Sequence, residues 1–418
     1  MYKKSVLIVI IQLIGSFLGL LNIYFIAGNM KPEIYSLVGV FSILSTITMT
    51  FTDFGLETTL MREALYWQNT SESEKIRVYV TQAILSRILG FLILLPFLSV
   101  YIVYINFTKY SGKHLWLLAL FLLGAESSSV NNALALIVKS QGGYVFSQTA
   151  NVLNNYFIKF LGIAIYFWKG SYPYLIFYAL SSIPLLMIYI VKLRSVICFK
   201  YVDIYATIKK VYKAKYLWLR TDLDYLKMNA DSILVSTLFP PAVLGSYTIF
   251  KSLEQLSKNF IEGFFDILSQ HMVKDKGNPE KLKAAEKSIK HIRNIIILLI
   301  FLGAALFITN SQKWIRLIHL TKYDYMNTMI ITVAIISVLH LWGKYEMNTV
   351  AFFASSKMNL KMAMVTFLLT CMSFIWVVFF SNIYGVLLQK ITAYLVTSII
   401  ALAFFIKNRE AMYNKILQ

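Results

Sequence analysis

The sequence alternates long apolar runs with short polar loops. Each run has about 20 residues, the length that an α-helix needs to cross the hydrocarbon core of a bilayer. Inside that core a chain must satisfy its own backbone hydrogen bonds, which a helix does within one segment. The pattern therefore predicts an all-α, polytopic membrane protein with twelve transmembrane helices. We place them at about 5–27, 34–60, 78–105, 114–138, 146–168, 174–197, 220–239, 243–272, 294–310, 325–354, 362–381 and 384–406.

Composition agrees with a membrane protein, because 58% of the residues are hydrophobic and only 14% are charged. Soluble domains have about 25% charged residues. The first apolar run follows a basic start but is longer than the ~7–15 apolar residues of a cleaved signal peptide. We therefore expect it to remain as the first helix. Cys198 and Cys371 lie in or beside apolar runs, which does not suggest a disulfide framework.

The net charge of +20 is concentrated in alternate loops, on the same side as the two termini. Cytoplasmic loops of membrane proteins are enriched in Lys and Arg, so both termini are expected in the cytoplasm. In this setting the charge indicates topology and contact with membrane lipids, and no nucleic acid partner is expected. Residues 198–219 are basic, aromatic and amphipathic, and they predict a linker that lies on the lipid headgroups.

The linker divides the chain into an N-terminal six-helix lobe (1–197) and a C-terminal six-helix lobe (220–406), with a cytoplasmic tail at 407–418. When Pro32 is aligned with Pro241, apolar or aromatic residues recur at matching positions in both lobes. Internal repeats are typical of secondary transporters, in which the substrate site lies between the repeats. We therefore expect the two lobes to surround a central cavity.

The stretch from 220 to 266 is unusually rich in charge for such an apolar chain. Treated as helices, it has two charged stripes, formed by Arg220, Asp224, Lys227 and Asp231 and by Lys251, Glu254, Lys258 and Glu262. Charge exposed to hydrocarbon costs at least ~2.5–3.5 kcal/mol per group, so the stripes should line a wet cavity. The alternative is a pair of amphipathic helices on the cytoplasmic surface.

Polar residues in other apolar runs extend the set of candidates. Arg87 could line the cavity or form a salt bridge with an acid such as Glu126. Glu126 could couple transport to a cation, although its small neighbours are also typical of tight helix packing. A polar stripe suited to sugar hydroxyls or phosphate is formed by Gln148, Asn151, Asn155 and Lys159. Its amides could instead join helices to one another.

Four short segments, in order, resemble the polysaccharide flippases of the O-antigen type. The segments are Asp53-Phe-Gly-Leu, Arg62-Glu63, and Asp231-Ser-Ile-Leu followed by Leu244-Gly-Ser-Tyr247. These flippases belong to the multidrug/oligosaccharidyl-lipid/polysaccharide exporter superfamily. The resemblance covers the whole chain in length and helix layout. It implies a V-shaped bundle in the bacterial cytoplasmic membrane that moves undecaprenyl-diphosphate-linked oligosaccharides to the outer leaflet.

The resemblance also implies a cationic cavity, for which the matching residues are Arg62, Arg87, Lys159, Arg220, Lys227, Lys251, Lys258 and Lys344. A proton or sodium gradient would drive the transport. Asp231 is the first candidate for the coupling site, followed by Glu126, Asp224 and Glu254. The alternative for Asp231 is an ion pair with Lys251 or Lys258. A glycan polymerase and a chain-length regulator are further partners consistent with this role.

Two other functions compete with the flippase. One is a cation-coupled multidrug antiporter of the same superfamily, although a cavity rich in Lys and Arg would repel cationic drugs. The other is a glycan polymerase or ligase, which the short external loops disfavour. The sequence contains no nucleotide-binding P-loop, nucleophile motif or metal-ligand spacing. We therefore expect a transporter that is not an enzyme, with no cofactor and no metal site.

Overall fold

The computed structural model describes residues 2–55, 73–140, 143–195, 197, 203–274, 279–353 and 356–415. These residues are nearly all helical and contain no strand, which confirms the all-α fold class. Within the described ranges, nine helical segments are long and apolar enough to cross a membrane. They are Ile10–Ala27, Pro32–Phe51, Val80–Lys109, Leu115–Val138, Ser171–Leu193, Glu286–Thr309, Met326–Val350, Lys357–Phe380 and Ile383–Arg409.

The other three predicted spans are also helical, although they are too polar or too interrupted to be counted among the nine. The fifth consists of α6 (Tyr144–Val152), a π-helical turn η2 (Leu153–Ile158) and α7 (Lys159–Lys169). The seventh and eighth lie in α10 (Ile204–Leu238) and α11 (Pro241–Lys274). Their charged stripes lower the hydropathy of both helices.

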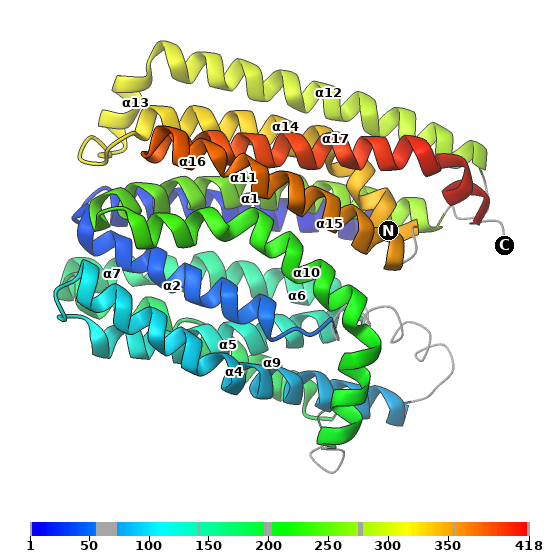
Figure 1. The fold of residues 1–418 in the computed structure, drawn as a ribbon, viewed down its shortest axis with the longest axis horizontal. Coiled ribbons are helices and arrows are strands. Elements are labelled where there is room, and N and C mark those ends of the chain that lie inside the picture. The colour runs from blue at the N-terminus through cyan, green and yellow to red at the C-terminus, as the bar shows by residue number, and fades with distance from the viewer. Residues whose placement is uncertain are drawn as a thin grey trace. The chain divides into compact units, whose positions relative to one another are not determined.

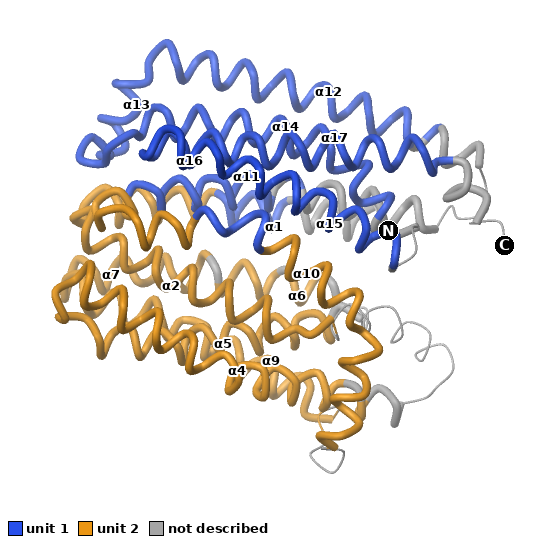
Figure 2. Tube along the Cα trace, viewed as in Figure 1, with its two compact units in different colours: residues 1–16, 226–231, 246–418 blue, residues 17–225, 232–245 orange. Residues whose placement is uncertain are grey.

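The chain divides into two compact units that each combine separate stretches of sequence (Figure 2). Unit 1 contains residues 1–16, 226–231 and 246–418, and unit 2 contains residues 17–225 and 232–245. The helices α1 (Tyr2–Asn22), α10 and α11 therefore each contribute to both units. The lobe limits at 197 and 220 remain predictions.

Unit 2 is organised around α5 (Leu115–Ser140), which packs against α6 and four other helices (Figure 1). Its other neighbours are α2 (Pro32–Phe51), α4 (Ser73–Lys109), α8 (Ser171–Leu180) and α9 (Ser182–Leu193). Close approach depends on Gly124, because a Cβ atom there would lie 2.2 Å from the carbonyl oxygen of Ala179. Small residues at such crossings let helix backbones approach in membranes.

Unit 1 has its helical core around α17 (Ile383–Lys415), which packs on α14 (Met326–Phe353), α15 (Ser356–Ser373) and α16 (Ile375–Phe380). The helix α12 (Pro279–Thr309) packs on α14 and is followed by the short helix α13 (Ser311–Leu317). Tyr345 and Phe405 meet edge to face inside this core, with ring centroids 5.7 Å apart. Large apolar side chains on these helices are exposed as well as buried, for example Leu368 and Ile406.

The two prolines that align in the sequence both begin a helix. Pro32 is the first residue of α2 and Pro241 is the first residue of α11. Proline suits this position because its fixed φ is helical and its missing N–H would have no partner there. The backbones meet within unit 2, because a Cβ on Gly245 would lie 2.2 Å from the carbonyl oxygen of Pro32. The equivalent aromatic residues Phe41 and Phe250 are both buried.

The predicted linker and the seventh span are not separate elements. Residues 204–219 form the first turns of α10, which continues to Leu238 without interruption. Asp203 caps the helix, since its side chain accepts a hydrogen bond from the backbone N–H of Ala206 at 2.9 Å. No proline or glycine lies between these residues and the charged stripe, so nothing local ends the helix.

The close contact at Gly124 gives a test of this packing. We expect Gly124→Ala to destabilise the protein by about 1–3 kcal/mol, the usual cost of overpacking a filled site. Gly303→Ala is the matched control, because a Cβ at Gly303 in α12 meets nothing within 4 Å. That change should be neutral or stabilise the helix by up to about 1 kcal/mol. Thermal unfolding in detergent compares the two variants, and equal midpoints would contradict the assigned contact.

Candidate functional site

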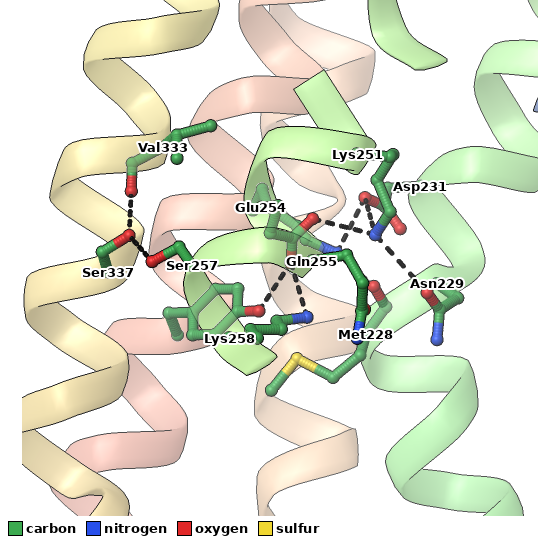
Figure 3. A network of polar contacts seen from close by, with 12 residues as sticks. Met228, Asn229, Asp231, Lys251, Glu254, Gln255, Ser257, Lys258, Val333 and Ser337 are labelled. Carbon is green, nitrogen blue, oxygen red and sulfur yellow. Dashed lines mark hydrogen bonds and ion pairs between the residues drawn. The ribbon is translucent and has the colours of Figure 1, made fainter. Parts of the chain in front are cut away.

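Unit 1 contains a buried network of five charged side chains (Figure 3). Asp231 comes from α10, Lys390 from α17, and Lys251, Glu254 and Lys258 come from successive turns of α11. The Nζ atom of Lys390 lies 2.8 Å from Oδ2 of Asp231 and 3.7 Å from Oε1 of Glu254. The network therefore joins three helices through one lysine that is fully buried.

The other two lysines also contact the carboxylates. Lys251 Nζ lies 2.9 Å from Oε2 of Glu254 and 3.8 Å from Oδ2 of Asp231. Lys258 Nζ lies 2.7 Å from Oε1 of Glu254. Their side chains are 21% and 16% exposed, whereas those of the two acids are 2% exposed or less. The lysines thus face the accessible side of the network and the acids its interior.

Neutral groups complete the network. Tyr394 donates its hydroxyl to Oε1 of Glu254 at 2.6 Å, and Tyr247 donates to Oδ2 of Asp231. Lys390 also donates to the backbone carbonyl of Met228. Buried charges are stable only when ion pairs and hydrogen bonds replace their lost hydration. With three lysines for two carboxylates, the network has an excess of one positive charge.

The alternative interpretation of Asp231, an ion pair across the hairpin, matches its contact with Lys251. Its other oxygen, Oδ1, is buried and has no hydrogen-bond partner among the described residues. Lys390, Lys251 and Tyr247 therefore all contact this carboxylate through Oδ2.

The remaining charges of the first stripe lie apart from this network. Arg220 Nε lies 3.6 Å from Oδ2 of Asp224, and both side chains are partly exposed. Lys227 is buried and donates to Oγ1 of Thr366 at 3.4 Å. Lys344 on α14 is partly buried. The structure therefore separates residues that the helical periodicity places on one stripe.

Unit 2 has its own buried cation, Arg87 on α4. Its guanidinium donates to the backbone carbonyl of Met49, to Oγ1 of Thr52 at 2.9 Å and to Oγ of Ser129 at 3.1 Å. Its Nη2 atom lies 3.8 Å from Oδ1 of Asp53. Among the described residues, Asp53 is the acid that pairs with Arg87. Arg62 itself lies outside the described residues.

Glu126 on α5 differs from every acid described above. Both of its carboxylate oxygens are buried, and neither has a hydrogen-bond partner among the described residues. The salt bridge that sequence analysis considered between Glu126 and Arg87 is not among the described ion pairs. A buried carboxylate without donors is suited to accept a proton.

The predicted polar stripe of the fifth span does not keep one α-helical register. The π-helical turn η2 lies between Asn151 and Lys159, and a π turn contains more residues than an α turn. Lys159 stacks over the ring of Tyr178 at 4.4 Å and donates to its hydroxyl at 3.3 Å. Asn151 is partly buried, while the side chain of Asn155 lies outside the described residues.

Lys390 is the residue that sequence reasoning missed. It is a single lysine in the apolar run 384–406. An ionisable residue inside a predicted transmembrane helix is a functional candidate by default, because its burial is costly. The single lysine in the run 384–406 is therefore a signal that the sequence itself contains. The described residues contain no group of three or more His, Cys, Asp or Glu arranged to hold a metal ion.

Comparison with solved structures identifies the fold of the whole chain. No family model and no curated protein matches the chain. An inward-facing multidrug resistance MATE family transporter of the MOP superfamily matches with a TM-score of 0.71, covering 99% of this chain and 98% of that one at 14% identity. The chain has the MATE transporter fold. The expected two-lobe, helical architecture is thus confirmed at the level of the fold, whereas the O-antigen flippase subtype has no support among these neighbours.

Two further structures support the assignment of the fold. A MATE protein in complex with MaL6 has a TM-score of 0.67 and 15% identity, covering 99% of this chain and 97% of that one. A MOP superfamily transporter from Pyrococcus furiosus Vc1 has a TM-score of 0.68 and 14% identity, covering 100% and 96%. The latter is described as having a binding pocket of reversed polarity that suggests a different function.

The network in unit 1 predicts an unequal response to loss of single charges. Lys390→Met leaves two buried carboxylates with a weaker set of partners, so we expect a loss of about 3–5 kcal/mol in the free energy of unfolding. The double variant Lys390→Met/Asp231→Asn removes both charges and should recover part of that loss. Thermal unfolding in detergent provides the measurement.

Arg220→Gln is the control for this prediction. It breaks the partly exposed pair with Asp224, and exposed pairs contribute only about 0–1 kcal/mol. A loss from Lys390→Met no larger than that from Arg220→Gln would show that Lys390 does not stabilise the buried acids.

Proposed function

We propose that this multi-pass membrane protein is a secondary transporter that works by alternating access and is not an enzyme. The observation that supports this most strongly is the MATE fold over 99% of the chain, shared with proteins described as transporters. Inverted or parallel repeats in such folds rock about a central substrate site. The predicted lobes would move in this way, with a central cavity between them. The basic loops support an orientation with both termini in the cytoplasm.

Transport would be coupled to a proton or sodium gradient. The sequence contains no nucleotide-binding P-loop, which leaves an ion gradient as the energy source. Of the proposed coupling residues, Glu126 has the contacts that suit proton exchange best, because no described residue donates to its buried oxygens. Asp231 is held by two lysines and a tyrosine, and Glu254 by three lysines and a tyrosine. Both acids would act mainly by positioning lysines.

The first candidate cargo is an organic cation, exchanged for the coupling ion as in a multidrug antiporter. Its support comes from the neighbours, since an outward-facing and an inward-facing structure of a multidrug resistance MATE transporter both match the chain. A cationic drug would need acids that are not neutralised by lysines.

The second candidate cargo is an anionic amphiphile, of which the undecaprenyl-diphosphate-linked oligosaccharide is the proposed example. A specific feature of this chain favours it. The network in unit 1 has three lysines for two carboxylates, and Lys251 and Lys258 are its most accessible members. Lysine binds phosphate as a point charge. The neighbour with a pocket of reversed polarity supports such a variation within the fold.

Ligand-dependent thermal stability distinguishes the two cargoes. A ligand that binds the folded state at about 100 times its dissociation constant stabilises it by about 2.7 kcal/mol. A fluorescent organic cation should raise the unfolding temperature of the purified protein if the antiporter proposal is right, and a polyprenyl diphosphate should do so for the flippase. Stabilisation by the diphosphate should disappear in Lys251→Gln/Lys258→Gln. No response to either compound would contradict both cargoes.

The role of Glu126 predicts a separation of binding from coupling. In Glu126→Gln we expect cargo binding to persist and gradient-driven accumulation in proteoliposomes to be lost, because an amide cannot exchange a proton near neutral pH. The matched control is Glu33→Gln, which changes an exposed acid in the first turn of α2. Full gradient dependence in Glu126→Gln would exclude this residue, and the same assay on Asp231→Asn would then test the other candidate.

A further inference from the structure

The first half of α10 exposes an aromatic and apolar face that no described residue covers. We call it the tyrosine face, and it consists of Tyr205, Ile208, Tyr212, Tyr216 and Leu219, whose exposed fractions range from 40% to 78%. Their spacing of three or four residues places them on one side of the helix. Exposed apolar patches of this kind usually mark a site of interaction.

The opposite side of the same helix is packed against unit 2. Thr207, Ala214 and Leu217 are buried. The contact is close, because a Cβ on Gly55 would lie 2.7 Å from the backbone nitrogen of Trp218 and 3.0 Å from the carbonyl oxygen of Ala214. Phe54 also meets the ring of Trp218 edge to face, with centroids 5.1 Å apart. The helix therefore cannot rotate to bury the tyrosine face within the unit.

Lysines border the tyrosine face on both sides. Lys209 and Lys213 are exposed along one border, and Lys215 lies along the other. The Nζ atom of Lys215 lies 4.0 Å from the ring centroid of Tyr212 and 5.5 Å from that of Tyr216. An apolar face bordered by lysines is typical of helices that lie in the headgroup region, where their charge attracts anionic lipids.

The direction of this half of α10 fits such a position. Within unit 2 it runs steeply across the direction of α2 and α4, next to the residues that follow the end of α2 (Figure 1). Both helices contain segments long and apolar enough to cross a membrane. If they do, a segment at a steep angle to their ends lies close to the plane of the membrane surface. Tyrosine is enriched at that depth because its ring is apolar and its hydroxyl is wet.

We propose that the tyrosine face is a binding surface for anionic phospholipid headgroups of the leaflet on the side of the predicted cytoplasmic loops. The tyrosines and Leu219 enter the headgroup region, and Lys209, Lys213 and Lys215 contact lipid phosphates. The lipid surface would thereby hold the start of α10, and the same helix continues to Asp231 in the charged network. This site is independent of the transported cargo.

Spin-label accessibility in the full-length protein tests the proposal. Cys198 and Cys371 are replaced with Ser, and a nitroxide is placed at Tyr212→Cys or, for comparison, at Lys213→Cys. The protein is reconstituted in vesicles of phosphatidylcholine alone or mixed with phosphatidylglycerol. We expect the label at 212 to collide several-fold more with oxygen than with a water-soluble nickel complex, and the label at 213 to show the reverse. Phosphatidylglycerol should increase the contrast.

The lysines provide the second measurement. The effect of phosphatidylglycerol on the label at 212 should be lost in Lys209→Gln/Lys213→Gln/Lys215→Gln. It should persist in the control Lys109→Gln/Lys113→Gln/Lys313→Gln, which removes the same charge from other loops. Water exposure of the label at 212 in both kinds of vesicle would overturn the proposal and indicate a surface for a protein partner. An equal loss in the two triple variants would show a non-specific charge effect and would also overturn it.

Discussion

Charge inside the apolar bundle is stable only where opposite charge or hydrogen bonds surround it, and this constraint organises both units. Arg87 satisfies it with a backbone carbonyl, two hydroxyls and Asp53. Lys390 satisfies it with Asp231, Glu254 and the carbonyl of Met228. Each arrangement ties together helices that are far apart in the sequence, so the polar contacts specify which apolar helices become neighbours.

The same constraint makes Glu126 unusual, because this buried acid lacks such contacts. The oxygens of Glu126 are buried without a described donor. In Glu254, by contrast, Oε1 contacts Tyr394 and Lys258, and Oε2 lies 2.9 Å from Lys251. In a transporter, a fully paired acid stabilises the structure and a poorly paired one can change its protonation during the cycle. Glu126 and Glu254 are the same amino acid in the sequence, and their different contacts in the structure distinguish their roles.

The fold bears on whether the protein is a transporter, and the charge pattern bears on which cargo it would carry. The MATE fold, shared at 14–15% identity, is decided by helix layout and small-residue contacts such as Gly124 with Ala179. In the charged network, Lys251 and Lys258 are partly exposed, whereas Asp231 and Glu254 are buried. Because one fold can host different chemistry, the fold alone does not identify the cargo.

Sequence alone determined the helical membrane fold, the positions of the apolar helices and most of the charged residues of interest. It did so because hydrocarbon thickness sets helix length, and because each charge in an apolar run is costly. Tertiary structure alone decided the partners: Asp53 with Arg87, Lys390 with Asp231, and the division of the stripe from Arg220 to Asp231 into separate contacts. Helical periodicity places a side chain on a face, but its partner comes from another helix, and only packing brings the two together.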